Sequence, residues 1–320
     1  MGRVNLITGP NAVGKSSVLE AILRFGDYSK QKNNTIQFGA NQATVRLDIK
    51  KGTSLTKHYL VAQRGTNGTS IKKNQPLGPL ATVYFGPNDN NLFNGGPQER
   101  RSFLDSACGT LKREYRQNLT EYQKIVRQKN DILKRGAPNK TLLETYNYQL
   151  IQQADFLIKD RLLFLEEISQ PTSATHGCLT KKTLTIDIVY QSKTNIGDVK
   201  DSLGEQLRAK EELETIRGCC LVGPHRDDLS FLIDGVDVAE FGSQGEKKTA
   251  CLALKIAQLK NLQENNLKPL LVLDDALSEL DIQRRQLLLE LVAECEQTFI
   301  SATDHIGLEL GEGVKRFELK

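Results

Sequence analysis

The 320-residue sequence lacks any apolar run that approaches the roughly 20 residues needed to cross a bilayer. Its charged start, Met1-Gly-Arg-Val-Asn5, also lacks the pattern of a secretory signal peptide. These two absences argue against an integral membrane or secreted protein. We therefore expect a cytoplasmic protein without a membrane partner.

Cysteine and histidine are too few and too scattered to form a zinc site. None of the six cysteines lies in a CxxC pair, and the four histidines are far apart in the sequence. We expect reduced, mostly buried thiols. The sequence also lacks internal repeats and low-complexity tracts.

The chain has only a small excess of positive charge, but that charge is unevenly distributed. In total 43 Lys and Arg stand against 39 Asp and Glu, a net charge of +4. The segment Gln98–Lys140 alone has eleven basic and five acidic residues. We interpret this segment as the basic part of the protein.

A phosphate-binding loop lies near the start of the sequence. GPNAVGKS, residues 9–16, matches the pattern GxxxxGK followed by Ser or Thr, between an apolar strand at 4–8 and an amphipathic helix at 15–24. Its glycines let backbone N–H groups face a phosphate at a helix N-terminus. Lys15 is expected to reach the β- and γ-phosphates, and the Ser16 hydroxyl to ligate Mg²⁺. The predicted nucleotide contacts are Gly9, Pro10, Asn11, Ala12, Val13, Gly14, Lys15, Ser16 and Ser17.

An acidic strand end lies more than 250 residues further along the chain. LLVLDD, residues 270–275, is typical of a buried parallel strand that delivers carboxylates to the edge where phosphates bind. We expect Asp274 to hold the Mg²⁺ shell and Asp275 to polarise an attacking water. The alternative is an acidic helix cap after a core strand.

Two further segments have the composition of helix starts. Phe241–Lys247, FGSQGEK, opens a long amphipathic helix with glycine, serine and glutamine, which would give a second phosphate-binding helix N-terminus. Ser278–Asp281 follows the acidic strand closely. Taken singly, each segment could simply cap its own helix.

Charged helical periodicity from Gln98 to about Ile168 separates two α/β segments, and Gln170–Thr175 is expected to be a linker. The predicted fold class is α/β, with a split P-loop ATPase head and an inserted, mostly helical arm. We place the N-terminal lobe of the head at 1–90, the arm at 91–215 and the C-terminal lobe at 216–320.

Taken together, the motifs resemble the RecF family, bacterial DNA replication and repair ATPases related to the ABC and SMC families. The resemblance covers nearly the whole chain in the family's order. Its segments are GPNAVGKSSVLEAI (9–22), YFGPNDNNLFNGGPQERRSFLD (84–105), YQKIVRQKNDILK (122–134), GPHRDDL (223–229), GSQGEKKTACLALKIAQL (242–259) and LLVLDDALSELD (270–281).

The resemblance implies a nucleotide site completed by a second copy of the chain. The signature residues Ser243, Gln244, Gly245 and Glu246 would contact ATP bound to the opposite subunit of a homodimer. Asp281 would belong to the loop that couples the halves. Thr303 aligns with the switch region that senses the γ-phosphate, while His305 is a less well aligned alternative.

Three features depart from the family pattern or stay open. Members usually have a β-hairpin before the phosphate-binding loop, and we expect its absence to alter the adenine-side contacts and one sheet edge. Asp27–Gln31 is only a loose counterpart of an arginine-bearing family segment. In Gly223–Leu229, Arg226 could meet a phosphate or form a buried ion pair with one of the following aspartates.

The basic segment is predicted to contact DNA without reading its sequence, because it resembles no base-reading module. The predicted DNA contacts are Arg100, Arg101, Arg113, Arg116, Lys124, Arg127, Lys129, Lys134 and Arg135. A solvated helical face is the alternative for any single one of them.

The function implied by the resemblance is ATP-dependent DNA binding in recombinational repair. ATP with Mg²⁺ would close a homodimer on duplex, gapped or junction DNA, and slow, DNA-stimulated hydrolysis would reset it. Its implied partners are RecR and RecO, and indirectly RecA. Other SMC- or ABC-type chromosome ATPases, small-substrate P-loop kinases and a non-hydrolysing DNA-binding scaffold are the alternatives.

Overall fold

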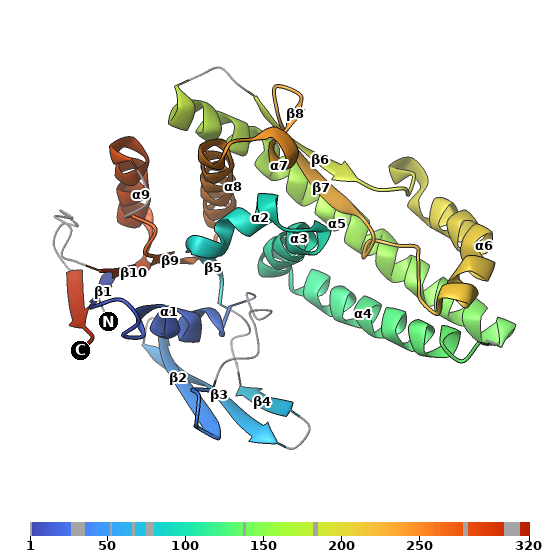
Figure 1. The fold of residues 1–320 in the computed structure, drawn as a ribbon, viewed down its shortest axis with the longest axis horizontal. Helices are drawn as coiled ribbons and strands as arrows, with labels where there is room; N and C mark the ends of the chain where they lie inside the picture. Colours follow the sequence, from blue (N-terminus) through green and yellow to red (C-terminus); the bar gives the residue numbers. More distant parts are fainter. Residues whose placement is uncertain are drawn as a thin grey trace. The chain divides into compact units, whose positions relative to one another are not determined.

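The computed structural model describes residues 2–26, 36–51, 53–65, 68–74, 80–136, 139–181, 185–277, 281–303 and 314–320. The chain divides into two compact units (Figure 1). We call Met1–Pro87 with Leu262–Lys320 the head unit, and Asn88–Asn261 the arm unit. No helix in the described ranges is long and apolar enough to span a membrane.

A five-stranded sheet forms the centre of the head unit, in the order β11-β1-β10-β9-β5. All of its pairings are parallel. The inner strands are almost entirely buried, as expected for a parallel sheet with both faces covered. The strands are β1 (Val4–Thr8), β5 (Thr82–Phe85), β9 (Leu270–Asp274), β10 (Gln297–Ala302) and β11 (Val314–Glu318).

Two helices follow strands of this sheet at the predicted places. α1 (Lys15–Leu23) follows β1 and buries Leu19 and Ile22 in a cluster that includes Val272 of β9 and Phe299 of β10. α9 (Ile282–Glu294) follows β9, and the Asp281 carboxylate caps it by accepting the Arg284 backbone N–H at 2.9 Å.

The edge strand β11 is not among the predicted strands. It pairs with β1 over its whole length, from Val4 opposite Val314 to Thr8 opposite Glu318. Four of its five side chains are exposed, so its sequence, VKRFE, has no apolar run or clean alternation to mark it.

A second, antiparallel sheet in the head unit consists of β2 (Gln42–Lys51), β3 (Ser54–Gly65) and β4 (Gly68–Asn74). One of its faces packs on a small core that contains Phe25, Leu60 and Ala62. This face holds the sheet on the rest of the unit, while the opposite face carries the exposed residues of the alternating pattern.

The arm unit is mainly helical, as predicted, and contains a three-stranded antiparallel sheet. α4 and α5 lie side by side (Figure 1). They share the core of the unit, in which Tyr122 and Ile125 lie with Leu150 and Leu157. Its helices are α2 (Asn91–Asn94), α3 (Pro97–Leu111), α4 (Arg113–Leu133), α5 (Lys140–Thr180), α6 (Val199–Arg217), α7 (Val238–Phe241) and α8 (Gln244–Glu264, whose end lies in the head unit). Its strands are β6 (Ile186–Gln191), β7 (Asp228–Ile233) and β8 (Val236–Asp237).

The predicted linker at Gln170–Thr175 is wrong, because α5 continues through it with Pro171 inside the helix. Burial of Ile168 and Thr172 in the arm unit outweighs the break that proline favours. The Thr172 hydroxyl also donates to the Ile168 carbonyl at 2.7 Å, one turn earlier in the helix.

The arm unit extends to Asn261 rather than to the predicted limit at 215. Its hydrophobic core includes Phe231, Val238 and Leu254 together with residues of α3, α4 and α5. The segment from 216 to 261 therefore packs with the arm helices, although the predicted boundary assigned it to the C-terminal lobe of the head.

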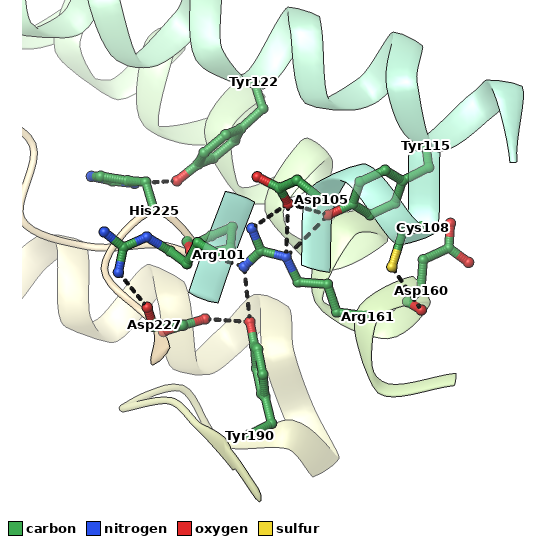
Figure 2. A network of polar contacts seen from close by, with 11 residues as sticks. Arg101, Asp105, Cys108, Tyr115, Tyr122, Asp160, Arg161, Tyr190, His225 and Asp227 are labelled. Carbon is green, nitrogen blue, oxygen red and sulfur yellow. Dashed lines mark hydrogen bonds and ion pairs between the residues drawn. The ribbon is translucent and has the colours of Figure 1, made fainter. Parts of the chain in front are cut away.

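A buried polar network at Arg161 connects the arm elements (Figure 2). The Arg161 guanidinium donates to Asp105 Oδ1 at 2.7 Å, to the Tyr115 hydroxyl at 3.0 Å and to the Tyr190 hydroxyl at 3.2 Å. It also donates to the Pro224 carbonyl at 2.9 Å. One side chain of α5 thus joins α3, α4, β6 and the loop before β7, which fixes their packing.

The segment Gly223–Leu229, whose role the sequence leaves open, closes this network. Asp227 accepts from the Tyr190 hydroxyl at 2.6 Å and from Ser192 Oγ at 2.8 Å. Its backbone carbonyl accepts from Arg101 at 2.7 Å. Burial raises the pKa of the Asp227 carboxyl, and the hydrogen bonds from Tyr190 and Ser192 lower it by a smaller amount.

Neighbouring charges of the same segment have separate partners. Asp228 forms a bidentate ion pair with Arg100, in which both nitrogen–oxygen distances are 2.8 Å. Arg226 donates to the Cys220 carbonyl at 2.7 Å instead of pairing with either aspartate. The predicted alternative of an ion pair between Arg226 and one of these aspartates is therefore wrong, and Asp228 pairs with Arg100 instead.

Lys129 on α4, one of the predicted DNA contacts, lies in the core of the arm unit. Its ammonium is 2.6 Å from Glu214 Oε2 on α6, with 0% and 1% of the two side chains exposed. The other Glu214 oxygen accepts the Leu221 backbone N–H at 2.7 Å. The predicted DNA contact is wrong, because a phosphate cannot reach this ammonium.

Replacing one member of this buried pair should destabilise the arm unit strongly. Lys129→Met leaves the Glu214 carboxylate buried without its cation, so we expect the free energy of unfolding to fall by about 3 kcal/mol. The double variant Lys129→Met, Glu214→Gln should recover part of the loss. Lys124→Met, at an exposed pair with Glu121, is the matched control and should change stability by less than about 0.5 kcal/mol. Chemical denaturation measures these differences, and equal losses at both lysines would contradict the buried pair.

His225 should make stability depend on pH. Burial lowers its pKa from 6.5 to about 4, while its ring bonds to the Tyr122 hydroxyl and lies 3.3 Å from the Cys220 carbonyl. Between these pH values the unfolded chain binds the extra proton and the folded chain does not, so stability falls as the pH drops from about 6.5 to about 4. Thermal melting across this range should show a smaller loss for His225→Gln than for the unmodified chain. Parallel curves would rule out a buried neutral His225.

Candidate functional site

The loop between β1 and α1 has the backbone of a phosphate cradle. Gly9 and Gly14 have φ values of 150° and 107°, a region that side chains rarely adopt. A Cβ on Gly9 would also lie 2.5 Å from the Leu319 carbonyl oxygen. Glycine is therefore required at both ends of the loop, and the loop leads directly into the N-terminus of α1.

Lys15 places a positive charge inside this loop. Its ammonium donates to the carbonyl oxygens of Gly9 at 2.7 Å and Pro10 at 2.9 Å, and only 7% of the residue is exposed. No acidic residue in the described ranges forms an ion pair with it. The charge is thus held by neutral carbonyls and stays available to attract an anion.

Ser16 and Asp274 meet at the edge of the parallel sheet. Ser16 Oγ donates to Asp274 Oδ1 at 3.0 Å, although 258 positions separate them in the sequence. A hydroxyl and a carboxylate are the hard oxygen donors that Mg²⁺ prefers, so the pair fits the predicted metal. Among the described residues no group of three or more His, Cys, Asp and Glu could hold an ion by itself. A magnesium ion here would take its remaining ligands from phosphates and water.

Two residues that the sequence analysis does not assign to the site orient Asp274. Ser301 on β10 donates to Asp274 Oδ1 at 2.6 Å, and the Tyr84 hydroxyl on β5 donates to Oδ2 at 3.4 Å. Both side chains are buried. The register that sets Ser301 opposite Asp274 accounts for the first of these contacts.

Asp275 follows directly after β9 in a left-handed conformation, with φ of 51°. Its backbone N–H donates to Ser301 Oγ at 2.9 Å, so one serine hydroxyl supports both aspartates. Such a φ is uncommon for a residue other than glycine and is often found where geometry is imposed by function. Asp275 directly follows Asp274 in the chain, and its role as the base that polarises water stays a prediction.

Thr303 and Asp281 are the remaining predicted contacts in the head unit. Thr303 follows β10, whose Ala302 is opposite Thr8 of β1, so it lies at the same sheet edge as the loop at Gly9. Asp281 caps α9 and is half exposed. Asp27–Gln31, Ser278–Leu280 and His305, which also carry predictions, lie outside the described residues.

The signature residues form the exposed start of α8 in the arm unit. The Ser243 hydroxyl donates to Glu246 Oε2 at 2.8 Å, and the Ser243 backbone N–H donates to the same oxygen at 2.9 Å. The Glu246 N–H returns a bond to Ser243 Oγ at 3.3 Å, which completes a capping box. Ser243, Gln244, Gly245 and Glu246 are all exposed, and the helix N-terminus remains open to solvent.

The structure divides the nine predicted DNA contacts into two groups. Arg100, Arg101 and Lys129 serve the internal contacts described above, and Arg116 bonds to the Gly109 carbonyl. The exposed group lies on α4 and the turn after it, and comprises Arg113, Lys124, Arg127, Lys134 and Arg135. Only this second group presents its charges to solvent, and its availability to DNA stays a prediction.

Comparison with known proteins shows which family has this arrangement. A family model described as AAA domain matches residues 2–291. The DNA replication and repair protein RecF of Bacillus cytotoxicus is 32% identical over 326 residues, which covers 96% of this chain and 87% of the relative.

Solved structures support the same assignment. The structure of the recombination mediator protein RecF-ATP in the RecFOR pathway is similar with a TM-score of 0.85 and 28% identity, covering 99% of this chain and 90% of that one. The Smc head domain derived from Pyrococcus furiosus shares the fold, with a TM-score of 0.51 at 14% identity, over 100% of this chain and 88% of that one. These similarities confirm the predicted fold class. The chain belongs to the RecF family of DNA replication and repair proteins.

Proposed function

We propose that this protein is an ATP-dependent DNA-binding ATPase of recombinational repair and replication. In this proposal ATP closes a homodimer on duplex or gapped DNA, and slow, DNA-stimulated hydrolysis opens it. RecR and RecO are the proposed partners, with RecA as the protein finally loaded. The contact of Ser16 with Asp274 beneath the Lys15 loop carries the proposal, because it joins both nucleotide motifs at one edge of the sheet.

Nucleotide binding is supported by the chemistry of the head unit. The loop supplies backbone N–H groups and a helix N-terminus, and Lys15 supplies a charge that no described acid neutralises. A magnesium ion, when bound, would neutralise phosphate charge beside Ser16 and Asp274. Ser301 holds Asp274 in place and leaves Asp275 beside it to accept a proton from water.

Dimerisation is supported by the open start of α8. Its capping box satisfies the N–H groups of Ser243 and Glu246 from within, while all four residues from Ser243 to Glu246 stay exposed. Such a surface can accept the γ-phosphate of a nucleotide held by a second copy. The solved relative named RecF-ATP is consistent with a nucleotide-dependent role for the family.

A DNA-facing role of the arm rests on the exposed basic face of α4. Arg113, Lys124 and Arg127 are spaced at about whole numbers of helical turns, so their side chains project from one side of the helix. Lys134 and Arg135 extend this face past the helix end. Contacts of this type are made with phosphates and should be independent of base sequence.

Replacing Lys15 should abolish the increase in DNA binding that ATP causes. Lys15→Met should weaken ATP binding at least about tenfold, since it removes a charge-assisted hydrogen bond of roughly 1.5–3 kcal/mol. Fluorescence anisotropy on duplex, single-stranded and junction DNA should then show no gain on addition of ATP and Mg²⁺. Lys260→Met, at an exposed position on α8, is the matched control and should behave as the unmodified chain. Equal ATP-dependent DNA binding by Lys15→Met would contradict the proposal.

Changing the signature serine should block the ATP-dependent dimer while nucleotide still binds. Ser243→Arg fills the phosphate-facing helix start with a long side chain. Ser243→Asp keeps the helix cap but repels phosphate, so both variants should stay monomeric in light scattering with ATP and Mg²⁺. Ser243→Thr retains the hydroxyl and should still dimerise. A mass that is independent of ATP in the unmodified chain would overturn the dimer.

A further inference from the structure

The head unit contains a second concentration of positive charge that the predicted DNA contacts omit. Residues 42–74 include seven Lys and Arg but a single acid, Asp48. This net charge of +6 equals that of the Gln98–Lys140 segment. The interpretation that basicity is confined to the arm is therefore incomplete, and the β2–β3–β4 sheet needs its own explanation.

The alternation of β2 separates the sheet into an apolar inner face and a polar outer face. Val45 and Leu47 point toward the core of Phe25, Leu60 and Ala62, and are only partly exposed. The residues between them, Thr44, Arg46, Asp48 and Lys50, are all exposed. Because side chains alternate between the two faces of a strand, these charged residues of β2 all lie on the outer face of the sheet.

Pairing registers assemble these side chains into rows across the outer face. Arg46 is opposite Tyr59, which is opposite Asn74 on β4. Lys72 is in the adjacent row, opposite Val61, which is itself opposite Thr44. On the other side of Arg46 come the pairs Asp48 with Lys57 and Lys50 with Leu55. Four cations therefore share one face with a single carboxylate.

The four cations of this face are not neutralised by ion pairs with described acidic residues of the protein. Within the described ranges Arg46, Lys50, Lys57 and Lys72 form no ion pair. By contrast, Arg100 and Lys129 of the arm are paired with Asp228 and with the buried Glu214. Lys73, which belongs to the inner face, instead lies over the Phe25 ring at 5.7 Å from its centre. The outer cations remain hydrated charges that a polyanion can neutralise.

We propose that the outer face of β2, β3 and β4 binds the phosphate backbone of duplex DNA. This proposal rests on the proposed DNA-binding function and adds a contact surface to it. Residues 44–50 of β2 span about 20 Å at roughly 3.3 Å per residue, a length that accommodates several successive phosphates. The charged ends contact phosphates, and the Tyr59 hydroxyl can donate to a phosphate or sugar oxygen in the same row.

The composition of the face favours duplex over single-stranded DNA. Single-strand binding surfaces combine a basic groove with several aromatic side chains on which bases stack. Among the paired positions on this face only Tyr59 is aromatic. The face thus has lysines and an arginine for phosphates but only one aromatic side chain for bases to stack on. This composition fits duplex DNA, in which the bases stay inside the double helix.

The test compares the DNA binding of a sheet variant, a control that loses the same charge, and an arm variant. The sheet variant carries Arg46→Gln, Lys50→Gln, Lys57→Gln and Lys72→Gln. Its control carries Arg208→Gln, Lys260→Gln, Lys268→Gln and Lys315→Gln, which remove the same charge from other exposed positions. An arm variant carries Arg127→Gln, Lys134→Gln and Arg135→Gln. Anisotropy titrations on a fluorescent duplex with ATP and Mg²⁺, at several salt concentrations, give affinity and salt slope for each.

The sheet variant should bind duplex about tenfold or more weakly, and its slope of log K against log salt should shrink by about 3 to 4, nearly one for each phosphate that the removed cations neutralise. The control should keep most of the slope. ATP affinity and melting temperature should not change in the sheet variant, because its substitutions lie on exposed side chains. An unchanged slope in the sheet variant would overturn the proposal.

Failure of the sheet surface is distinguishable from failure of the proposed function. If the unmodified chain binds no duplex in ATP and Mg²⁺, the proposed function itself fails. If the unmodified chain binds and the sheet variant binds equally well, only the sheet proposal fails. Lysine acetylation with and without duplex provides direct proof of contact. Lys50, Lys57 and Lys72 should be protected by DNA, and equal labelling would refute their role.

Discussion

The parallel register of β1, β10 and β9 is the constraint on which the nucleotide site depends. It sets Thr8 opposite Ala302 and Ser301 opposite Asp274, so the carboxyl ends of strands from both ends of the chain share one edge. The loop at Gly9, the pair of Ser16 with Asp274 and the strained Asp275 all follow from it. A shift of one residue would turn Ser301 to the opposite face and remove the support from both aspartates.

Arg161 has a comparable role in the arm unit. Its donors reach α3, α4, β6 and the segment Gly223–Leu229, so helices and strands from distant sequence positions share one buried cation. A satisfied network of this kind specifies one arrangement of the core, because any displacement leaves a buried polar atom unpaired. The family segment that sequence alone could not explain thereby acquires a structural role.

The use of charge differs between the two basic regions. In the arm, Lys129 and Arg100 neutralise acids inside the unit, and only part of the predicted surface presents its charge to solvent. In the β2–β3–β4 sheet the strand period directs Arg46, Lys50 and Lys57 outward, and little acid accompanies them. Counting charges along the sequence therefore locates basic segments but not basic surfaces.

Sequence by itself determined the elements whose signals are local. Glycine positions, apolar runs and helical spacing predict the phosphate-binding loop with its strand and helix, and also the buried strand that ends at Asp274. The start of α9 after Asp281 follows from the capping residues there. Tertiary structure alone decided β11, the helix through Pro171, the burial of Lys129 and the support of Asp274 by Ser301 and Tyr84. Each of these depends on a partner far away in the chain, and burial against that partner outweighs local preference.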